Sequence, residues 1–307
     1  MSNSQNNFMV TMLGTASAMP VVNRSQSAQA LQVHGRLFLV DAGEGVQTQM
    51  MRFHVSMSKL EAVFISHVHG DHVFGLSGLL STFGMGGRTA PLHVYGPGNL
   101  RPFLNFFLSY NEWLPYEIAF HPVNTRFPSV IMETKSVEVT AFPLLHGIET
   151  YGYIFREKEP MWNVRKECIE QYGLSLTEIG TLKRGEDVVR EDGTVIPLEV
   201  AAYKPFTPRS YAYVSDTAVF PGEAEVLRGV TALYHETTFL NEHADKAAAR
   251  FHSTTRQAAQ VALDAGVSKL IIGHYSSRNT DQRLYEAECR EVFPESYAAA
   301  DGDVYEI

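Results

Sequence analysis

The sequence contains little cysteine and no long hydrophobic segment. Two of its 307 residues are cysteines, Cys168 and Cys289, and they form neither a Cys-x-x-Cys pair nor a disulfide framework. This pattern is typical of a reducing compartment. The first ten residues, MSNSQNNFMV, lack the positive and apolar segments of a signal peptide, and no apolar run approaches the length of a membrane span. We therefore expect a cytoplasmic protein without membrane contact.

The sequence is also short of positive charge. It has 25 Lys and Arg residues against 34 Asp and Glu residues, which gives a net charge of −9 with neutral histidines. Overall electrostatics therefore do not predict a binder of polyanions. If the substrate is a nucleic acid, a local patch or bound cations must attract it. Hydrophobic residues make up 45% of the chain, which is enough for a substantial core.

Short apolar runs alternate with helical patterns along the chain. The runs that predict strands are 8–14, 27–35, 36–43, 61–66, 92–96, 136–147, 210–216, 230–236 and 268–274, and the helical patterns are 45–53, 75–83, 98–108 and 253–266. This interleaving predicts a layered α/β fold with buried sheets in a single domain over 1–307. Residues 156–205 are polar and contain three prolines, so we expect them to form an insertion.

Histidines and aspartates follow four of the predicted strands. The first cluster is HVHGDH at 67–72, and the full set is His67, His69, Asp71, His72, His146, Asp216 and His274. Side chains at strand ends can converge on one site while the sheet holds them rigid. Imidazoles and carboxylates suit zinc, and also manganese or iron. Seven ligands are too many for one tetrahedral zinc, so the pattern predicts two metal ions with one shared carboxylate. Two such ions can clamp a phosphoryl group and generate hydroxide.

The same segments carry a family resemblance. HxHxDH resembles the signature of the metallo-β-lactamase superfamily. Further motifs are similar to the short bacterial form of ribonuclease Z, the family of tRNA 3′-processing endonucleases: LGTASAMP, VDAGEGVQTQM, FISHVHGDHVFGLSGLL, HGIETYGY, KRGE, YVSDT, HETTF, FHSTT and GHYSSR. The resemblance covers nearly the whole chain. It implies an αββα sandwich with a flexible inserted arm.

The resemblance also assigns roles to individual residues. It implies one zinc held by His67, His69, His146 and Asp216, and a second held by Asp71, His72, His274 and the shared Asp216. Asp71 would accept a proton or orient the attacking hydroxide. His252, supported by Glu236, would protonate the departing 3′-oxygen. The implied reaction is hydrolysis of a phosphodiester in precursor tRNA, which leaves a 3′-hydroxyl on the tRNA and a 5′-phosphate on the trailer.

The inserted arm at 156–205 would bind tRNA, in the family usually across a homodimer. Its matching segment, SLTEIGTLKRGE, lacks the usual glycine–proline motif, and residues 156–190 contain seven basic and seven acidic residues. The candidate RNA-binding residues are Arg165, Lys166, Lys183 and Arg184 in the arm, and Arg24 in the segment PVVNRS. The alternative is an ordinary solvated surface for these cations.

Two other functions remain open on the sequence alone. One is a hydrolase of the same superfamily that acts on a small phosphodiester or thioester. The other is a non-catalytic RNA-binding scaffold that kept the fold. The arm argues against the first, because a small-molecule enzyme does not need it. The complete set of candidate ligands argues against the second.

Overall fold

The structure, a computed structural model, describes residues 7–307. Residues 1–6, which hold most of the segment inspected for a targeting signal, lie outside this range. The chain forms two compact units. The core unit runs to Glu133 and continues with Glu138–Arg156 and Arg209–Ile307, and the inserted unit consists of Thr134–Val137 and Glu157–Pro208. No helix within residues 7–307 is both long enough and apolar enough to cross a bilayer.

Two seven-stranded sheets dominate the core unit as described. The first sheet has the order β18 (Val304–Glu306), β1 (Phe8–Gly14), β2 (Ala28–Val33), β3 (Arg36–Val40), β4 (Leu60–Phe64), β5 (Leu92–Pro97) and β6 (Ile118–Val123). The second has the order β17 (Ser296–Ala298), β16 (Lys269–Gly273), β15 (Ala232–Glu236), β14 (Ser210–Val214), β9 (Tyr151–Glu157), β8 (Val137–Pro143) and β7 (Ser129–Glu133). Strands β3 to β6 run parallel, as do β14 to β17.

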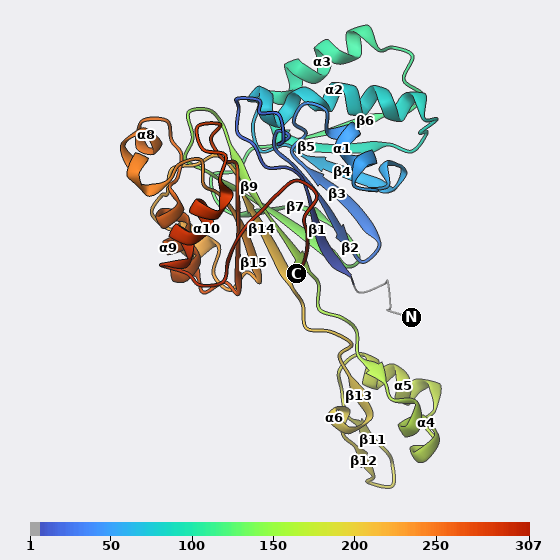
Figure 1. Ribbon diagram of the computed structural model, residues 1–307. Coiled ribbons are helices and arrows are strands. Elements are labelled where there is room, and N and C mark those ends of the chain that lie inside the picture. Colours follow the sequence, from blue (N-terminus) through green and yellow to red (C-terminus); the bar gives the residue numbers. More distant parts are fainter. Residues whose placement is uncertain (1–6) are drawn as a thin grey trace. The chain divides into compact units, whose positions relative to one another are not determined.

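Helices cover the outer side of each sheet (Figure 1). The first sheet carries α1 (Val46–Arg52), α2 (Gly70–Met85) and α3 (Leu100–Tyr110), and the second carries α7 (Glu223–Val226), α8 (Ala244–Ala249), α9 (Thr255–Ala265) and α10 (Gln282–Arg290). Short 3₁₀ turns lie at Met57–Lys59 and Asn241–His243. The α/β sandwich expected from the sequence is therefore confirmed.

Aromatic side chains join the inner faces of the two sheets. Phe64 of β4 contacts both Tyr153 and Phe155 of β9, with ring centroids 5.4 and 5.1 Å apart. Phe38 of β3 stacks on Phe155 at 5.9 Å. These rings are almost completely buried, so the interface fixes the strand ends of one sheet against those of the other.

The inserted unit leaves the chain between β9 and β14 and has a core of its own. Its elements are β10 (Asn163–Val164), α4 (Lys166–Tyr172), α5 (Leu176–Lys183), β11 (Val188–Val189), β12 (Val195–Ile196), α6 (Leu198–Ala201) and β13 (Ala202–Tyr203). Leu182 and Ile196 are fully buried in this core. Ser175 and Glu178 form a capping box at the start of α5.

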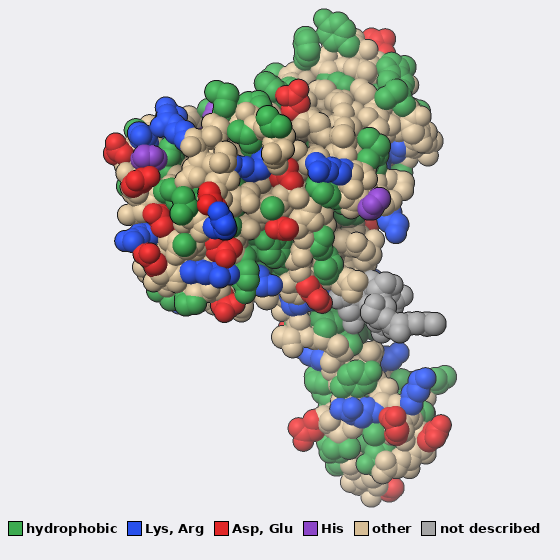
Figure 2. All heavy atoms as spheres, in the orientation of Figure 1, with side chains coloured by type: hydrophobic (Ala, Val, Ile, Leu, Met, Phe, Trp, Pro, Cys, Tyr) green, Lys and Arg blue, Asp and Glu red, His purple; other side chains and the backbone are tan. Residues whose placement is uncertain are grey.

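On the face of the molecule in Figure 2, acidic and basic side chains are interspersed.

Candidate metal centre

The predicted ligands lie where strands and one helix end. His67 follows β4, and His69 is the N-cap of α2, so Asp71 and His72 lie in the first turn of that helix. The sequence pattern placed this helix at 75–83, five residues too late. Its true start matters, because an aspartate in the first turn is favoured by the helix dipole. His274 follows β16 with a φ of 60°, a left-handed conformation that turns the chain sharply.

The first ligand set contains His67, His69, His146 and Asp216. Nε2 of His67 lies 3.0 Å from Nδ1 of His69, which lies 3.4 Å from Nε2 of His146. Oδ2 of Asp216 lies 3.7 Å from His67 Nε2 and 3.9 Å from His146 Nε2. Four ligands around a tetrahedral zinc are about 3.3–3.5 Å apart, so these donors fit one cation.

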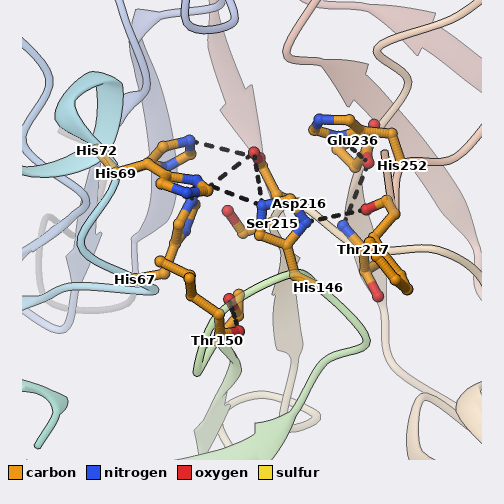
Figure 3. A network of polar contacts seen from close by, with 12 residues as sticks. His67, His69, His72, His146, Thr150, Ser215, Asp216, Thr217, Glu236 and His252 are labelled. Atoms are coloured by element: carbon orange, nitrogen blue, oxygen red, sulfur yellow. Dashed lines mark hydrogen bonds and ion pairs between the residues drawn. The ribbon is translucent and has the colours of Figure 1, made fainter. Parts of the chain in front are cut away.

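The second ligand set contains Asp71, His72, His274 and the same Asp216. Nε2 of His72 lies 3.3 Å from His274 Nε2 and 3.3 Å from Oδ2 of Asp71. Oδ1 of Asp216 lies 3.4 Å from His72 Nε2 and 3.1 Å from His274 Nε2. The two oxygens of Asp216 thus face different ligand sets. Figure 3 shows Asp216 together with His67, His69, His72 and His146.

Hydrogen bonds on the outer side of each ring fix the protonation of His72 and His67. Nδ1 of His72 lies 2.7 Å from Oδ2 of Asp41, a carboxylate that can only accept, so this nitrogen carries the proton. The hydroxyl of Ser66 donates to Asp41 and therefore accepts from Nδ1 of His67. Nε2 of each ring is then the atom that faces the centre and is available to a metal ion.

The same logic holds for His146 and His274. Nδ1 of His146 donates to the Phe251 carbonyl at 3.0 Å. The Thr238 hydroxyl gives its proton to Glu236 at 2.7 Å, so it accepts from Nδ1 of His274 at 2.8 Å. The ring atoms that converge on the centre are thus the Nε2 atoms of His67, His72, His146 and His274, a donor set that a divalent cation can bind. Oδ1 of Asp216 is also buried without a hydrogen-bond partner among residues 7–307.

Buried carboxylates dominate the electrostatics of the centre. Burial alone would lower the pKa of His72, but the charges of Asp71, Asp216 and Asp41 outweigh it and raise that pKa well above its usual value. Burial and the neighbouring His72 lower the pKa of His67 well below its usual value. The donor set therefore combines imidazole nitrogens and anionic oxygens, which fits a divalent metal.

Glu236 and His252 form a pair beside the second ligand set. Oε1 of Glu236 lies 2.8 Å from Nδ1 of His252, and the same carboxylate accepts backbone N–H groups from Thr217, Thr238 and Ser253. Burial disfavours charge on His252, but the Glu236 carboxylate raises the pKa of the imidazole to about 9. His252 lines the same hollow as the ligands, so the predicted partners do lie together at the centre.

The hollow over the centre has a volume of about 610 Å³ and includes residues that the sequence reasoning missed. Arg250 and Arg278 both line it, together with Ser276, Ser277 and Met19. Neither arginine side chain has an ion-pair partner within the described part of the chain. Both arginines could have been found from the sequence by their distance to predicted site residues: Arg250 precedes His252 by two positions, and Arg278 ends the motif GHYSSR that contains His274.

The RNA-binding candidates divide into two groups. Arg165, Lys166 and Lys183 line one hollow of about 640 Å³ in the inserted unit, together with Tyr203. The Arg165 guanidinium lies 5.1 Å from the centroid of the Tyr203 ring. Arg184 lies outside this hollow and pairs with Glu186 at 3.4 Å.

Arg24 is engaged within the core unit. Its guanidinium lies over Tyr275 and donates to the Asn279 carbonyl at 3.1 Å. It does not line the hollow over the metal centre. The loop that leads from His274 into α10 is thereby held by Arg24, which is a structural use of this side chain.

Comparison of the sequence with known proteins shows the family of this chain. Ribonuclease Z of Bacteroides fragilis (strain YCH46) is 40% identical over 296 residues, which are 95% of this chain and 96% of the relative. Ribonuclease Z of Cytophaga hutchinsonii is 40% identical over 302 residues, 98% of this chain and 96% of the relative. A family model described as anti-Pycsar protein Apyc1 matches residues 8–103, less than half of the chain.

Solved structures show the same fold. Human tRNase Z, short form, matches with a TM-score of 0.70 and 25% identity over 97% of this chain and 98% of its own. The metallo-beta-lactamase fold protein YhfI from Bacillus subtilis matches with a TM-score of 0.70 at 18% identity, over 98% of this chain and all of its own. Since sequence and fold agree along almost the full length of these proteins, the chain belongs to the ribonuclease Z family, endoribonucleases built on the metallo-β-lactamase fold.

Proposed function

We propose that this protein removes the 3′ trailer from precursor tRNA by phosphodiester hydrolysis at a centre of two zinc ions. The observation that carries the proposal is Asp216, whose two oxygens face two separate sets of ligands with spacings that suit tetrahedral zinc. The products would be a tRNA with a 3′-hydroxyl and a trailer with a 5′-phosphate. Membership of the ribonuclease Z family supports tRNA as the substrate.

The seven ligands would hold the two ions as the family pattern implies. His67, His69, His146 and Asp216 would hold one, and Asp71, His72, His274 and Asp216 the other. When bound, such ions supply a hydroxide at neutral pH and neutralise charge on the phosphate; manganese or iron can do the same. Asp71 would orient the attacking oxygen. Burial would raise the pKa of the Asp71 carboxyl, but His72 and His274 outweigh burial and hold that pKa well below its usual range, so the carboxyl is ionised.

The leaving 3′-oxygen of the tRNA needs a proton, and His252 is the group placed to give it. Its Nδ1 is held by Glu236 at 2.8 Å, so Nε2 is the atom left for the substrate. Glu236 is anchored by three backbone N–H groups and keeps the imidazole oriented and charged. We assign His252 as the general acid and Glu236 as the residue that positions it.

The inserted unit would bind tRNA through a cationic cluster of its own. Arg165, Lys166 and Lys183 gather in one hollow with the Tyr203 ring, an arrangement suited to phosphates and a stacked base or sugar. Arg24 and Arg184 already have protein partners, so we rank them below these three cations. This local cluster would offset the net charge of −9.

We also propose a homodimer in which the inserted unit of one subunit binds the tRNA processed by the other. The family resemblance supports this arrangement. The test mixes a variant without the inserted unit, whose metal centre is intact, with the variant Asp71→Ala, whose inserted unit is intact. Each variant alone should be inactive, and the mixture should cut precursor tRNA because one subunit binds the tRNA that the other cuts. A mixture that stays inactive would contradict the arrangement. Sedimentation of the unmixed protein gives the oligomeric state directly.

The substrate class is tested by removing the inserted unit cleanly. Arg156 of β9 pairs with Ser210 of β14 in antiparallel register, so a two-residue turn can replace 158–208 and close the strands as a hairpin. The shortened protein should lose kcat/KM on precursor tRNA by about 100-fold or more and keep hydrolysis of a small phosphodiester. The full chain on both substrates is the control.

Two results would contradict the proposal. If the full chain hydrolyses the small phosphodiester well and does not cut any precursor tRNA, the protein is a small-molecule hydrolase. If neither substrate is cut by the zinc-loaded full chain while RNA still binds, it is a scaffold. Equal loss of both activities in the shortened protein would make the inserted unit a structural element.

A further inference from the structure

An apolar groove opens at the same edge of the second sheet as the metal centre. It has a volume of about 390 Å³ and is lined mainly by aromatic, proline and leucine side chains. Its walls are three loops: Arg126–Pro128 before β7, Leu144 and Leu145 after β8, and Phe220–Gly222 after β14. Since β7 and β8 are antiparallel, the start of β7 and the end of β8 lie at one edge.

Phe127 projects from a turn that is ordered by its own hydrogen bonds. The side chain is 75% exposed, which is unusual for a phenylalanine on a rigid loop. The hydroxyls of Thr125 and Ser129 both donate to the Phe127 carbonyl, and these two hydroxyls lie 2.8 Å from each other. The backbone of the turn is therefore ordered, and the ring is exposed to solvent instead of buried.

Two loops connect the groove directly with the metal centre. Leu145 lines the groove and His146, the next residue, is a candidate metal ligand. Asp216 is a candidate ligand and Phe220 lines the groove four positions later, a reach of at most about 14 Å. The loops are joined by a hydrogen bond from the Ala218 N–H to the Leu145 carbonyl at 2.9 Å.

Charge also suits a nucleotide at this place. Arg126 is exposed on the groove wall and has no ion-pair partner among residues 7–307. An aromatic ring, proline faces and a free guanidinium are the elements with which proteins hold single-stranded RNA, through base stacking and a phosphate contact. The groove shares no lining residue with the hollow over the centre, so it offers a second, separate subsite.

We propose that this groove binds the first nucleobase of the trailer by stacking on Phe127. The inference rests on the proposed function, because it assumes a phosphodiester in the metal centre. The chemistry indicates which side of the cut lies in the groove. The leaving 3′-oxygen belongs to the tRNA and must face His252, so the tRNA terminus occupies the hollow lined by His252 and Arg250. The trailer must then depart on another side, and the groove begins at Leu145, the residue next to His146 of the centre.

The test compares two precursor tRNAs that differ in one position. Both carry a short trailer, and in one of them the first trailer nucleotide is abasic. We measure kcat/KM on each with the same protein preparation and take the ratio of base-bearing to abasic substrate. The wild-type ratio should be about 10, the lower range of what one stacked base contributes. Because an unfolded fraction lowers both values equally, the ratio does not depend on how well a variant folds.

The variants decide whether Phe127 is responsible. Phe127→Ala should lower the ratio to about 1, and Phe127→Trp, which keeps an aromatic face, should hold it near 10. Phe106→Ala is the matched control, because Phe106 is also a highly exposed phenylalanine of the core unit, 68% exposed, and lies outside the groove. It should leave the ratio and the activity unchanged.

The outcomes separate this inference from the proposed function. Cleavage of both precursors at equal rates, or an unchanged ratio in Phe127→Ala, would overturn the subsite and leave the endonuclease standing. A third precursor carries the abasic site in the last nucleotide of the tRNA. If Phe127→Ala changes the effect of that abasic site and not the effect of the one in the trailer, the groove binds the tRNA side of the cut and the inference is wrong. Failure to cut the base-bearing precursor at all would overturn the proposed function and the subsite with it.

Discussion

Asp41 accepts the Nδ1 proton of His72 at 2.7 Å, entirely out of contact with solvent. Three further donors converge on the same carboxylate: the Tyr213 hydroxyl and both the hydroxyl and the N–H of Ser66. Asp41 therefore orients a ligand of the second set directly and His67 of the first set through Ser66. One buried carboxylate without contact to a metal ion thus aligns both halves of the centre.

We predict that Asp41→Asn weakens metal binding about 10- to 100-fold without unfolding the protein. The substitution keeps the shape, and asparagine tolerates the left-handed φ of 56° at this position. It replaces an acceptor of the His72 proton by an amide that can turn its N–H₂ group to the ring. Competition with a chelator measures the affinity. Unchanged metal affinity in a variant that folds normally would show that Asp41 serves stability alone.

The second prediction concerns the proposed general acid. His252→Ala should slow precursor cleavage about 10²–10⁴-fold while both metal ions stay bound, because His252 belongs to neither main ligand set. Elemental analysis of the purified variant provides the control. Loss of metal instead would move His252 into the ligand set, which its place near Glu236 and His274 makes a concrete alternative.

Much of this site could be predicted from the sequence, because its ligands follow apolar runs that are true strands. The composition of EAVFIS, SYAYVSD and SKLIIGH predicts strands, and the bounds of β4, β14 and β16 lie within two residues of the predicted ranges. Other elements are absent from the predicted strands. Strand β9, YGYIFRE, is buried along most of its length and shows no alternation, and β18 is three residues long and pairs with β1 from the far end of the chain.

The contacts that tune the site could not be predicted in the same way. Asp41 and His72 are separated by 31 residues, and Thr238 and His274 by 36 residues. Hydrogen bonds over such separations depend on how neighbouring strands and helices pack and not on any local pattern. The early start of α2 has no local signal for a related reason: HGDH has no periodic apolar face, and the N-cap residue His69 makes no side-chain capping hydrogen bond.

The third prediction concerns a buried pair behind Glu236. Nε2 of His235 lies 3.0 Å from Oε1 of Glu223, and its Nδ1 donates to the Glu236 carbonyl at 2.7 Å. Burial opposes charge on this imidazole, but Glu223 outweighs burial and raises the pKa of His235 above its usual value. A raised folded-state pKa stabilises the fold fully below the unfolded value of about 6.5, and this contribution is lost as pH rises through the folded value.

Glu223→Gln should therefore lower the free energy of unfolding by about 3 kcal/mol at pH 6, and by clearly less at pH 9. Urea unfolding of the metal-free wild type and variant at both pH values measures the difference. Metal-free protein is used so that changes in metal binding do not contribute. An equal difference at pH 6 and pH 9 would mean that His235 is neutral in the folded protein.

The fourth prediction tests the hollow of the inserted unit. If Arg165 and Lys183 contact phosphates, their double alanine variant should bind precursor tRNA more weakly and with a shallower dependence on salt, by about one to two units of slope. A matched control removes the same charge from the core unit through Arg256→Ala and Arg283→Ala, whose partners are Glu291 and Asp281. The same slope in both double variants would remove the hollow from the RNA-binding surface.

The measurement that tests the central claim most directly maps the cut itself. A precursor tRNA labelled at its 5′ end and carrying a 3′ trailer is incubated with zinc-loaded protein, and the product end is located to the nucleotide. A single cut directly after the discriminator base, lost when a chelator is added and restored by zinc, is the predicted result. An intact precursor alongside rapid hydrolysis of a small phosphodiester would contradict the account, because the metal centre would then serve a different substrate.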